Sequence, residues 1–187
     1  MAGVIRSPDR AVGQISPPTA KTHGSIRALS ARRLHRLSQN LANVRGVNIC
    51  LLCHPEEAAR TFGRRVVWED PHWRLAVIES GSPIAGFAHL ETKRHIPDIT
   101  HLDREEAATL GPVLARVTAK LKAVTRADLI YIYVFGERVP HLHFNLAPHH
   151  EGDPLVGGPG LLREGAEPLA PEVLRDVSGR VEEALRG

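Results

Sequence analysis

A strict alternation of polar and apolar residues at 141–146 most constrains how this chain can fold. The segment reads His-Leu-His-Phe-Asn-Leu, and in a β-strand residues two positions apart lie on the same face, about 7 Å from one another. His141, His143 and Asn145 are therefore expected on one face, and the apolar residues that alternate with them on the face toward a core. Two imidazoles on one strand face suit a metal-binding pair, a nucleophile with a helper, or histidines in contact with solvent. The pattern alone does not decide between these roles.

The length of the chain supports one compact domain with a core. It has 187 residues, of which 42% are hydrophobic, and this is enough for a single folded unit with appended tails. No apolar run approaches the roughly 18 to 20 residues that span a bilayer, and the first residues lack the continuous apolar segment of a secretory signal. We therefore expect a cytoplasmic protein with no membrane contact.

Residues 1–44 are predicted to form a basic, largely disordered N-terminal arm, and residues 45–187 the folded domain. Eight Arg and Lys residues against one Asp precede residue 50, so this segment carries +7 while the whole chain carries +3. Prolines and weak periodicity favour disorder before residue 30, whereas Leu34, Leu37 and Leu41 follow helical spacing. A solvated tail with a short amphipathic helix is the favoured interpretation. A weak contact with nucleic acid or nucleotide phosphates and an organelle transit peptide stay open.

The remaining pattern predicts an α+β domain with an antiparallel sheet of about five strands. Runs at 64–68 and 73–78 flank Glu-Asp-Pro-His, which is typical of a hairpin, and further strands are expected at 86–90, at 129–135 and from 141. The last two should be antiparallel neighbours. Asp103 and Glu106 form a capping-box pattern before one long helix, in which Pro112 should cause a kink or move the start. A C-terminal amphipathic helix is expected over 173–185, and such segregated helices favour the α+β class.

The only two cysteines form a Cys-Leu-Leu-Cys motif at 50–53, followed by His54. Two thiolates at this spacing can bind one metal ion from a tight turn, and structural zinc completed by two distant histidines is the favoured interpretation. The motif also matches the pattern of covalent haem attachment, which requires export. A redox pair, which would need a thioredoxin-like context, and two free buried thiols stay open as well.

The order of motifs over residues 48–150 resembles the histidine triad (HIT) superfamily, including its galactose-1-phosphate uridylyltransferase branch. The matching elements are Cys50-Leu51-Leu52-Cys53, two hairpin strands, Lys93-Arg94-His95, a helix, a strand, and Pro140-His141-Leu142-His143-Phe144-Asn145-Leu146-Ala147-Pro148. The resemblance implies a HIT-type α+β fold, commonly a homodimer, that binds a nucleotide and attacks its α-phosphate with a histidine.

The resemblance also assigns roles to individual residues. The middle histidine of the motif is the family's nucleophile, which corresponds to His143. The zinc ligands of the zinc-bearing members correspond to Cys50, Cys53, His95 and His141. Zn²⁺ held by four protein ligands would be structural. A neutral imidazole is a competent nucleophile near neutral pH, and this scheme requires no Mg²⁺ site.

The chain departs from the family pattern in three places. Asn145 occupies the third motif position, where His or Gln is usual; its amide can donate to a phosphate oxygen but cannot relay a proton. Glu137 and Arg138 stand where many members carry Gln and Ser; Glu137 would repel a phosphate, and Arg138 could bind one in a bidentate manner. Thr92 precedes Lys-Arg-His, where Pro is common.

Further histidines have weaker assignments. His149 stands near the position of a phosphate-binding Arg in the family and is a candidate substrate-binding residue. Four other histidines are expected at the surface or in hairpins: His54, His72, His89 and His101. His54 could also serve as a spare zinc ligand because it adjoins the cysteine pair.

The leading hypothesis is a nucleotide hydrolase or nucleotidyltransferase that works through a covalent nucleotidyl-His143 intermediate. The alternative is a zinc-stabilised nucleotide-binding module that has lost efficient chemistry at Asn145 and Glu137. A third hypothesis makes the basic arm primary, with the domain as an accessory to nucleic-acid binding. The sequence names neither the base, nor the leaving group, nor the acceptor.

Overall fold

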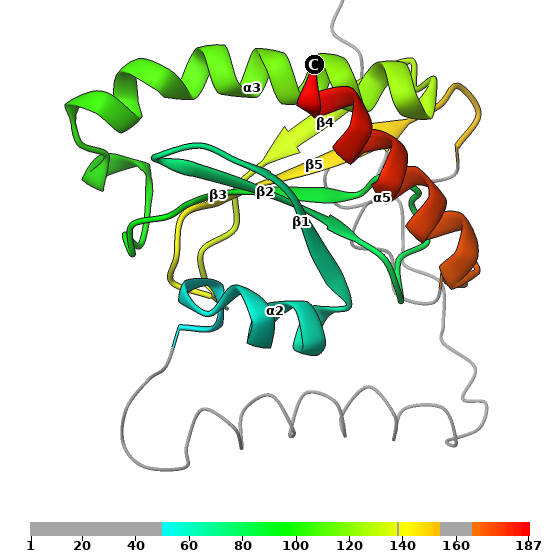
Figure 1. Ribbon diagram of the computed structural model, residues 1–187, viewed down its shortest axis with the longest axis horizontal. Coiled ribbons are helices and arrows are strands. Elements are labelled where there is room, and N and C mark those ends of the chain that lie inside the picture. Colours follow the sequence, from blue (N-terminus) through cyan, green and yellow to red (C-terminus); the bar gives the residue numbers. More distant parts are fainter. Residues whose placement is uncertain (1–49, 138, 154–165) are drawn as a thin grey trace, which may run out of the picture. The chain divides into compact units, whose positions relative to one another are not determined.

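The computed structural model describes residues 50–137, 139–153 and 166–187, and these form an α+β domain around one antiparallel sheet (Figure 1). The predicted arm at 1–44 lies outside the described residues. The sheet has five strands in the order β1-β2-β3-β5-β4, and all four neighbouring pairs are antiparallel. The strands are β1 (Arg64–Glu69), β2 (Trp73–Ile78), β3 (Ala88–Thr92), β4 (Leu129–Tyr133) and β5 (His143–His149). The predicted fold class and strand number are confirmed.

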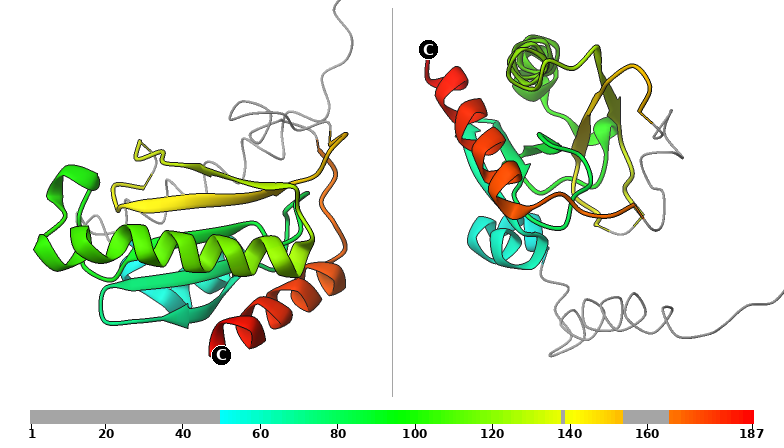
Figure 2. Two further views of the ribbon diagram at one scale, coloured as in Figure 1. Left: turned by 90° about the horizontal axis from the view of Figure 1, so that it is seen from above. Right: turned by 90° about the vertical axis from the view of Figure 1, so that its right-hand side faces the viewer.

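The core lies between one face of the sheet and two helices, α3 (Arg104–Thr125) and α5 (Pro171–Arg186), as Figures 1 and 2 show. The apolar stripe of α3 and the buried face of α5 both pack in the cluster that contains Leu75, Leu90 and Leu146. The short helix α2 (Pro55–Phe62) lies on the other side of the sheet and contacts β1. Helices α3 and α5 therefore cover the core face of the sheet, and α2 lies on the opposite side.

Helix α3 begins where the sequence predicts. The Asp103 side chain accepts hydrogen bonds from the N–H groups of Glu105 and Glu106, and the Glu106 side chain accepts one from the Asp103 N–H, which completes the capping box. Pro112 lies inside the helix and does not move its start, so a kink is the effect that stays expected of this proline. The cap thus satisfies N–H groups of the first turn that have no partner within the helix.

Sequence patterns do not predict three short elements: the 3₁₀ turns η1 (Leu51–Cys53) and η2 (Ile99–His101), and the helix α2. The signals for α2 are nevertheless present. Pro55 occupies the first helical turn, Glu56 and Glu57 follow it, and Gly63 ends the helix with φ of 59°. Proline tolerates a first turn, acidic residues favour a helix N-terminus, and glycine adopts the left-handed conformation without strain. Strand β3 also lies two residues later than predicted.

The alternation of polar and apolar residues at 141–146 is confirmed for its apolar face. Leu142, Phe144 and Leu146 are all buried in the core. The polar face differs in one respect, because β5 begins at His143 and His141 lies just before it. Within the described part of the chain, no helix is long and apolar enough to cross a membrane.

Candidate functional site

The residues before β5 are fixed against the segment that follows β3. The N–H of Leu142 donates to the carbonyl of Ile96 at 2.6 Å, and the N–H of Thr92 donates to the carbonyl of Leu142 at 3.3 Å. These hydrogen bonds hold Leu142, the residue after His141, beside the end of β3. The side chain of His141 is fully buried. The histidine thus turns toward the cysteine pair instead of joining the strand.

Four side chains converge on one point: Cys50, Cys53, His95 and His141. Their ligand atoms all lie within 4.8 Å of one another. The Sγ of Cys50 lies 3.3 Å from Nδ1 of His141, and the Sγ of Cys53 lies 3.3 Å from Nδ1 of His95 and 3.5 Å from Nδ1 of His141. Sulfur and nitrogen ligands at the edge of a zinc tetrahedron lie about 3.5 Å apart, as the usual Zn–S and Zn–N bond lengths require. The cluster is consistent with a zinc site.

The second nitrogen of His141 supports this interpretation. Its Nε2 lies 2.7 Å from the carbonyl oxygen of Thr92. Because a carbonyl oxygen only accepts hydrogen bonds, Nε2 carries the proton and Nδ1 presents its lone pair to the two thiols. Metal-ligating histidines are typically oriented by such a second hydrogen bond.

Two groups in the cluster have pKa values that favour the neutral form. Burial and the neighbouring Cys50 raise the pKa of the Cys53 thiol to about 11. Burial likewise lowers the pKa of His141. A divalent cation would offset the cost of the thiolate charges that these surroundings disfavour.

His143 has one ring nitrogen held and one free. Its Nδ1 lies 2.7 Å from the carbonyl oxygen of His141, so Nδ1 donates and Nε2 is left with its lone pair. No described residue forms a hydrogen bond with Nε2. The ring is half-buried, which leaves this nitrogen able to act as a nucleophile or an acceptor.

The side chain of Asn145 is buried and hydrogen-bonded to the neighbouring strand, which the sequence did not predict. Its side chain is 8% exposed, and its Nδ2 donates to the carbonyl oxygen of Tyr133 at 3.3 Å. Tyr133 and Asn145 are also register partners on β4 and β5. The amide thus ties the site to the edge strand and keeps one amide hydrogen engaged.

His89 corrects the expectation that it lies at the surface or in a hairpin. It is the second residue of β3, with Asn145 as its register partner on β5. Its ring meets the ring of His143 edge to face, with 5.7 Å between the centroids. Although part of the ring is accessible through a pocket, burial lowers the pKa of His89 to about 3, with further contributions from His143 and Arg64. His89 is therefore neutral near pH 7.

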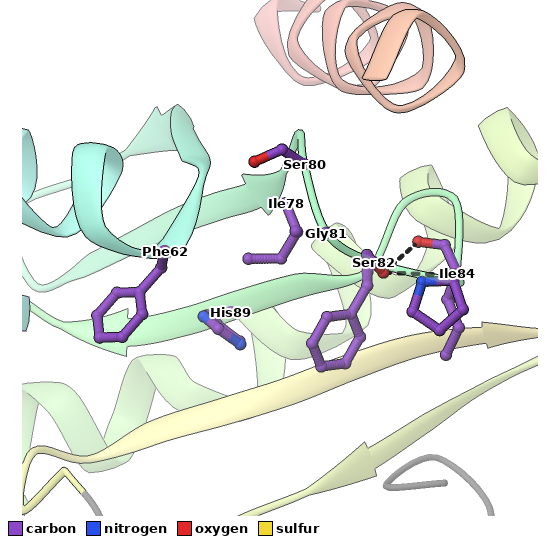
Figure 3. Close-up of a pocket in the computed structure, with 9 residues that line it drawn as sticks. Phe62, Ile78, Ser80, Gly81, Ser82, Ile84 and His89 are labelled. Carbon is purple, nitrogen blue, oxygen red and sulfur yellow. Dashed lines mark hydrogen bonds between the residues drawn. The ribbon is translucent and has the colours of Figure 1, made fainter. Parts of the chain in front are cut away.

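A pocket of about 260 Å³ opens beside His89 (Figure 3). Phe62 of α2 and Ile78 of β2 form apolar walls, and the loop at 80–84 supplies two serines. Its volume is near the lower end of the range for small-molecule sites, about 300 Å³. Sequence reasoning missed this pocket because its walls come from three elements without a shared motif.

No protein-family model and no curated protein matches the sequence. Solved structures do match. A histidine triad (HIT) protein from Sinorhizobium meliloti has 25% identity and a TM-score of 0.56, over 69% of this chain and 93% of that one. A hypothetical histidine triad nucleotide-binding protein from Sulfolobus tokodaii has 19% identity and a TM-score of 0.56, over 73% and 92%. A Zn-bound histidine triad family protein from Mycobacterium smegmatis has 18% identity and a TM-score of 0.52, over 73% and 96%.

The chain has the histidine triad fold. The predicted site residues on β5 do not all lie together in this fold. His143 and Asn145 lie on the face that carries His89, whereas His149 is six residues farther along β5, about 20 Å away by the rise of an extended strand. Its ring is tilted against the ring of Tyr131, with 5.0 Å between the two centroids. Glu137 is exposed in the β4–β5 connection, and Arg138 lies outside the described residues.

A buried cluster of ion pairs lies beside His143 in this histidine triad fold, centred on β3, the strand next to β5. Glu91, the register partner of His143, is fully buried. Its carboxylate accepts hydrogen bonds from Arg64 at 2.6 and 3.2 Å and from Arg74 at 3.2 Å. Arg74 also donates to the carbonyl oxygen of Leu52 at 3.4 Å. The cluster therefore links three strands to the turn that carries the cysteines.

Proposed function

We propose that this chain is a member of the HIT superfamily and a nucleotide hydrolase or nucleotidyltransferase that acts at the α-phosphate through a nucleotidyl-His143 intermediate. The observation that carries the proposal is the state of His143. Its Nδ1 donates to a main-chain carbonyl, and its Nε2 stays free beside a pocket-lining histidine. An imidazole held in this tautomer is a nucleophile that needs no deprotonation.

In the proposed reaction, the lone pair of His143 Nε2 attacks the α-phosphorus. A bond forms between nitrogen and phosphorus, and the bond from phosphorus to the leaving group breaks with its electron pair going to that group. Water or another hydroxyl compound then attacks phosphorus, the N–P bond breaks, and the proton of the acceptor passes to solvent. His143 returns to its starting state, so the cycle needs no redox partner.

Negative charge increases on the non-bridging phosphate oxygens in the transition state, and donors near them matter most. Arg138 and nearby main-chain N–H groups are the proposed donors. The exposed Glu137 would oppose binding of a phosphate if it turned inward. His149 receives no role in this scheme because of its distance along β5.

The pocket beside His89 is proposed to hold the nucleoside. Its apolar walls, Phe62 and Ile78, suit the faces of a base, and its serines suit ribose hydroxyls. The name of the Sulfolobus tokodaii protein, a nucleotide-binding protein of the same fold, supports this assignment.

Cys50, Cys53, His95 and His141 are proposed to hold a structural Zn²⁺. Four protein ligands leave no open coordination position for substrate. When bound, the ion would fix the turn at 50–53 to the chain before β5. The zinc-bound state of the Mycobacterium smegmatis protein supports this proposal.

The chain is also proposed to form a homodimer through β4. This strand is an edge of the sheet, and Leu129, Ile132, Val134 and Phe135 on and after it are exposed apolar residues. An unpaired edge strand with apolar side chains favours pairing with another strand. A second copy would pair β4 with β4 and cover the exposed apolar side chains on both copies.

The nucleotide-binding module is the second candidate, because the Asn145 amide is engaged with β4. One experiment separates the two. The full chain is incubated with adenosine and guanosine phosphoramidates and dinucleoside polyphosphates, quenched in base, and examined by intact and peptide mass spectrometry. The enzyme predicts a nucleotidyl adduct on His143 and turnover; the module predicts binding without either.

His143→Ala should abolish both adduct and turnover while zinc content and melting temperature stay near wild type. His101→Ala, an exposed histidine in the 3₁₀ turn η2 (Ile99–His101), is the matched control and should behave as wild type. Turnover that survives in His143→Ala would overturn the assignment.

A further inference from the structure

His89 stands between the pocket and the proposed nucleophile. Its ring lies edge to face with Phe87 on the pocket side, with 5.3 Å between centroids, and edge to face with His143 on the other side at 5.7 Å. In the view of Figure 3 it lies between Phe62 and the loop that carries Ser82. A nucleotide that reached from the pocket to His143 would pass this ring.

The polar atoms of His89 are available to a ligand. None of the described residues forms a hydrogen bond with either ring nitrogen, and the ring lines the pocket. Its cross-strand partner, Asn145, occupies the third position of the motif but uses one amide hydrogen on Tyr133. On this face, next to His143, His89 is thus a polar side chain whose ring forms no hydrogen bond with any described residue.

The charged groups around His89 favour an uncharged ring. His143 lies on the adjacent strand, and Arg64 of β1 belongs to the buried cluster with Glu91 and Arg74. Burial and the neighbouring His143 and Arg64 lower the pKa of His89 to about 3. Near pH 7 the ring therefore has one N–H donor and no charge.

We propose that His89 is a substrate-binding residue whose ring N–H donates a hydrogen bond to the phosphate placed at His143, the role that the engaged amide of Asn145 fills only in part. The inference rests on the proposed function, since it requires a nucleotide in the pocket. It adds a phosphate contact on β3, two strands away from the edge strand β4.

Isothermal titration of three proteins tests the proposal: wild type, His89→Leu and His89→Gln. Each is titrated with adenosine, guanosine and uridine 5′-monophosphates and with the corresponding nucleosides. His89→Leu should weaken binding of the monophosphate by about tenfold or more, as expected for loss of a hydrogen bond to a charged group, and leave nucleoside binding unchanged. His89→Gln, which keeps a neutral N–H donor, should recover most of the loss.

Three outcomes would contradict the proposal. Wild-type affinity of His89→Leu for the monophosphate would show that the ring makes no such contact. An equal loss of nucleoside and monophosphate binding would assign His89 to the pocket wall. If the wild type forms no adduct and binds no nucleotide, the proposed function fails first and this inference fails with it. Melting temperature and metal content check each fold, and His89→Met replaces the Leu variant if that variant does not fold.

Discussion

Nδ1 of His143 lies 2.7 Å from the carbonyl oxygen of His141, so one residue of the cluster of two cysteines and two histidines orients the proposed nucleophile. The His141 side chain is buried against the two thiols, and its Nε2 donates to Thr92. Main-chain hydrogen bonds from the N–H groups of His141 and Leu142 further hold the backbone at this point. Two histidines that are two positions apart in the sequence thus have different roles: His141 fixes the backbone before β5, and His143 on β5 keeps a free nitrogen.

Cys53→Ser is expected to abolish stoichiometric zinc binding and to lower the melting temperature by about 10 °C or more, because metal binding free energy contributes directly to folding. Metal analysis of the purified protein and thermal unfolding with and without a chelator measure both effects. His54→Ala is the matched control, since His54 is exposed and adjoins Cys53 but lies outside the cluster. Loss of zinc in the control, or its retention in Cys53→Ser, would contradict the assigned ligand set.

Sequence patterns predicted those parts of the fold that local rules decide. The capping box at Asp103 and Glu106 follows from spacing alone, and the buried face of β5 follows from the period of two at Leu142 and Phe144. The grouping of the cysteines with His95 and His141 came from the family resemblance, and the four ligand atoms do lie together.

The remaining features depend on register, which a single sequence does not determine. His89 looks like an isolated surface histidine until β3 pairs with β5 and brings it beside His143. Glu91 likewise looks exposed until Arg64 and Arg74, from two other strands, enclose it. Contacts between side chains on different strands depend on the strand register, and no spacing within one sequence predicts them.

Glu91→Ala is expected to lower the free energy of unfolding by about 3 to 5 kcal/mol, because it leaves two largely buried guanidinium groups without their counter-charge. Arg64 and Glu91 have side chains only 1% and 0% exposed, and Arg74 is 11% exposed. Urea unfolding measures the change. Glu79→Ala is the control: it removes a more exposed partner of Arg65, which keeps Glu182, and should cost at most about 1 kcal/mol. Equal losses in the two variants would argue against the buried cluster.

His89 should make the protein less stable as pH falls. Its folded pKa is lowered to about 3, whereas an unfolded histidine titrates near 6.5, so below that pH only the unfolded chain binds the proton. The free energy of unfolding should therefore fall toward acid by up to about 1.4 kcal/mol per pH unit from this group. Urea unfolding of wild type and His89→Gln between about pH 7 and pH 5 isolates the His89 share as the difference between the two slopes. Parallel slopes would mean that the ring takes up its proton in the folded state.

Ile132→Lys tests the proposed pairing of β4 with a second copy. Ile132 is 47% exposed on the edge strand, and a lysine there would bring like charges together across a two-fold β4 pair while removing apolar contact. The variant should be a monomer by light scattering coupled to gel filtration, with the wild type a dimer. Ile99→Lys serves as the control because Ile99 is 50% exposed and lies in η2, away from β4. A wild-type monomer, or an Ile132→Lys dimer, would rule out this interface, and dissociation of the Ile99 variant would move it to another surface.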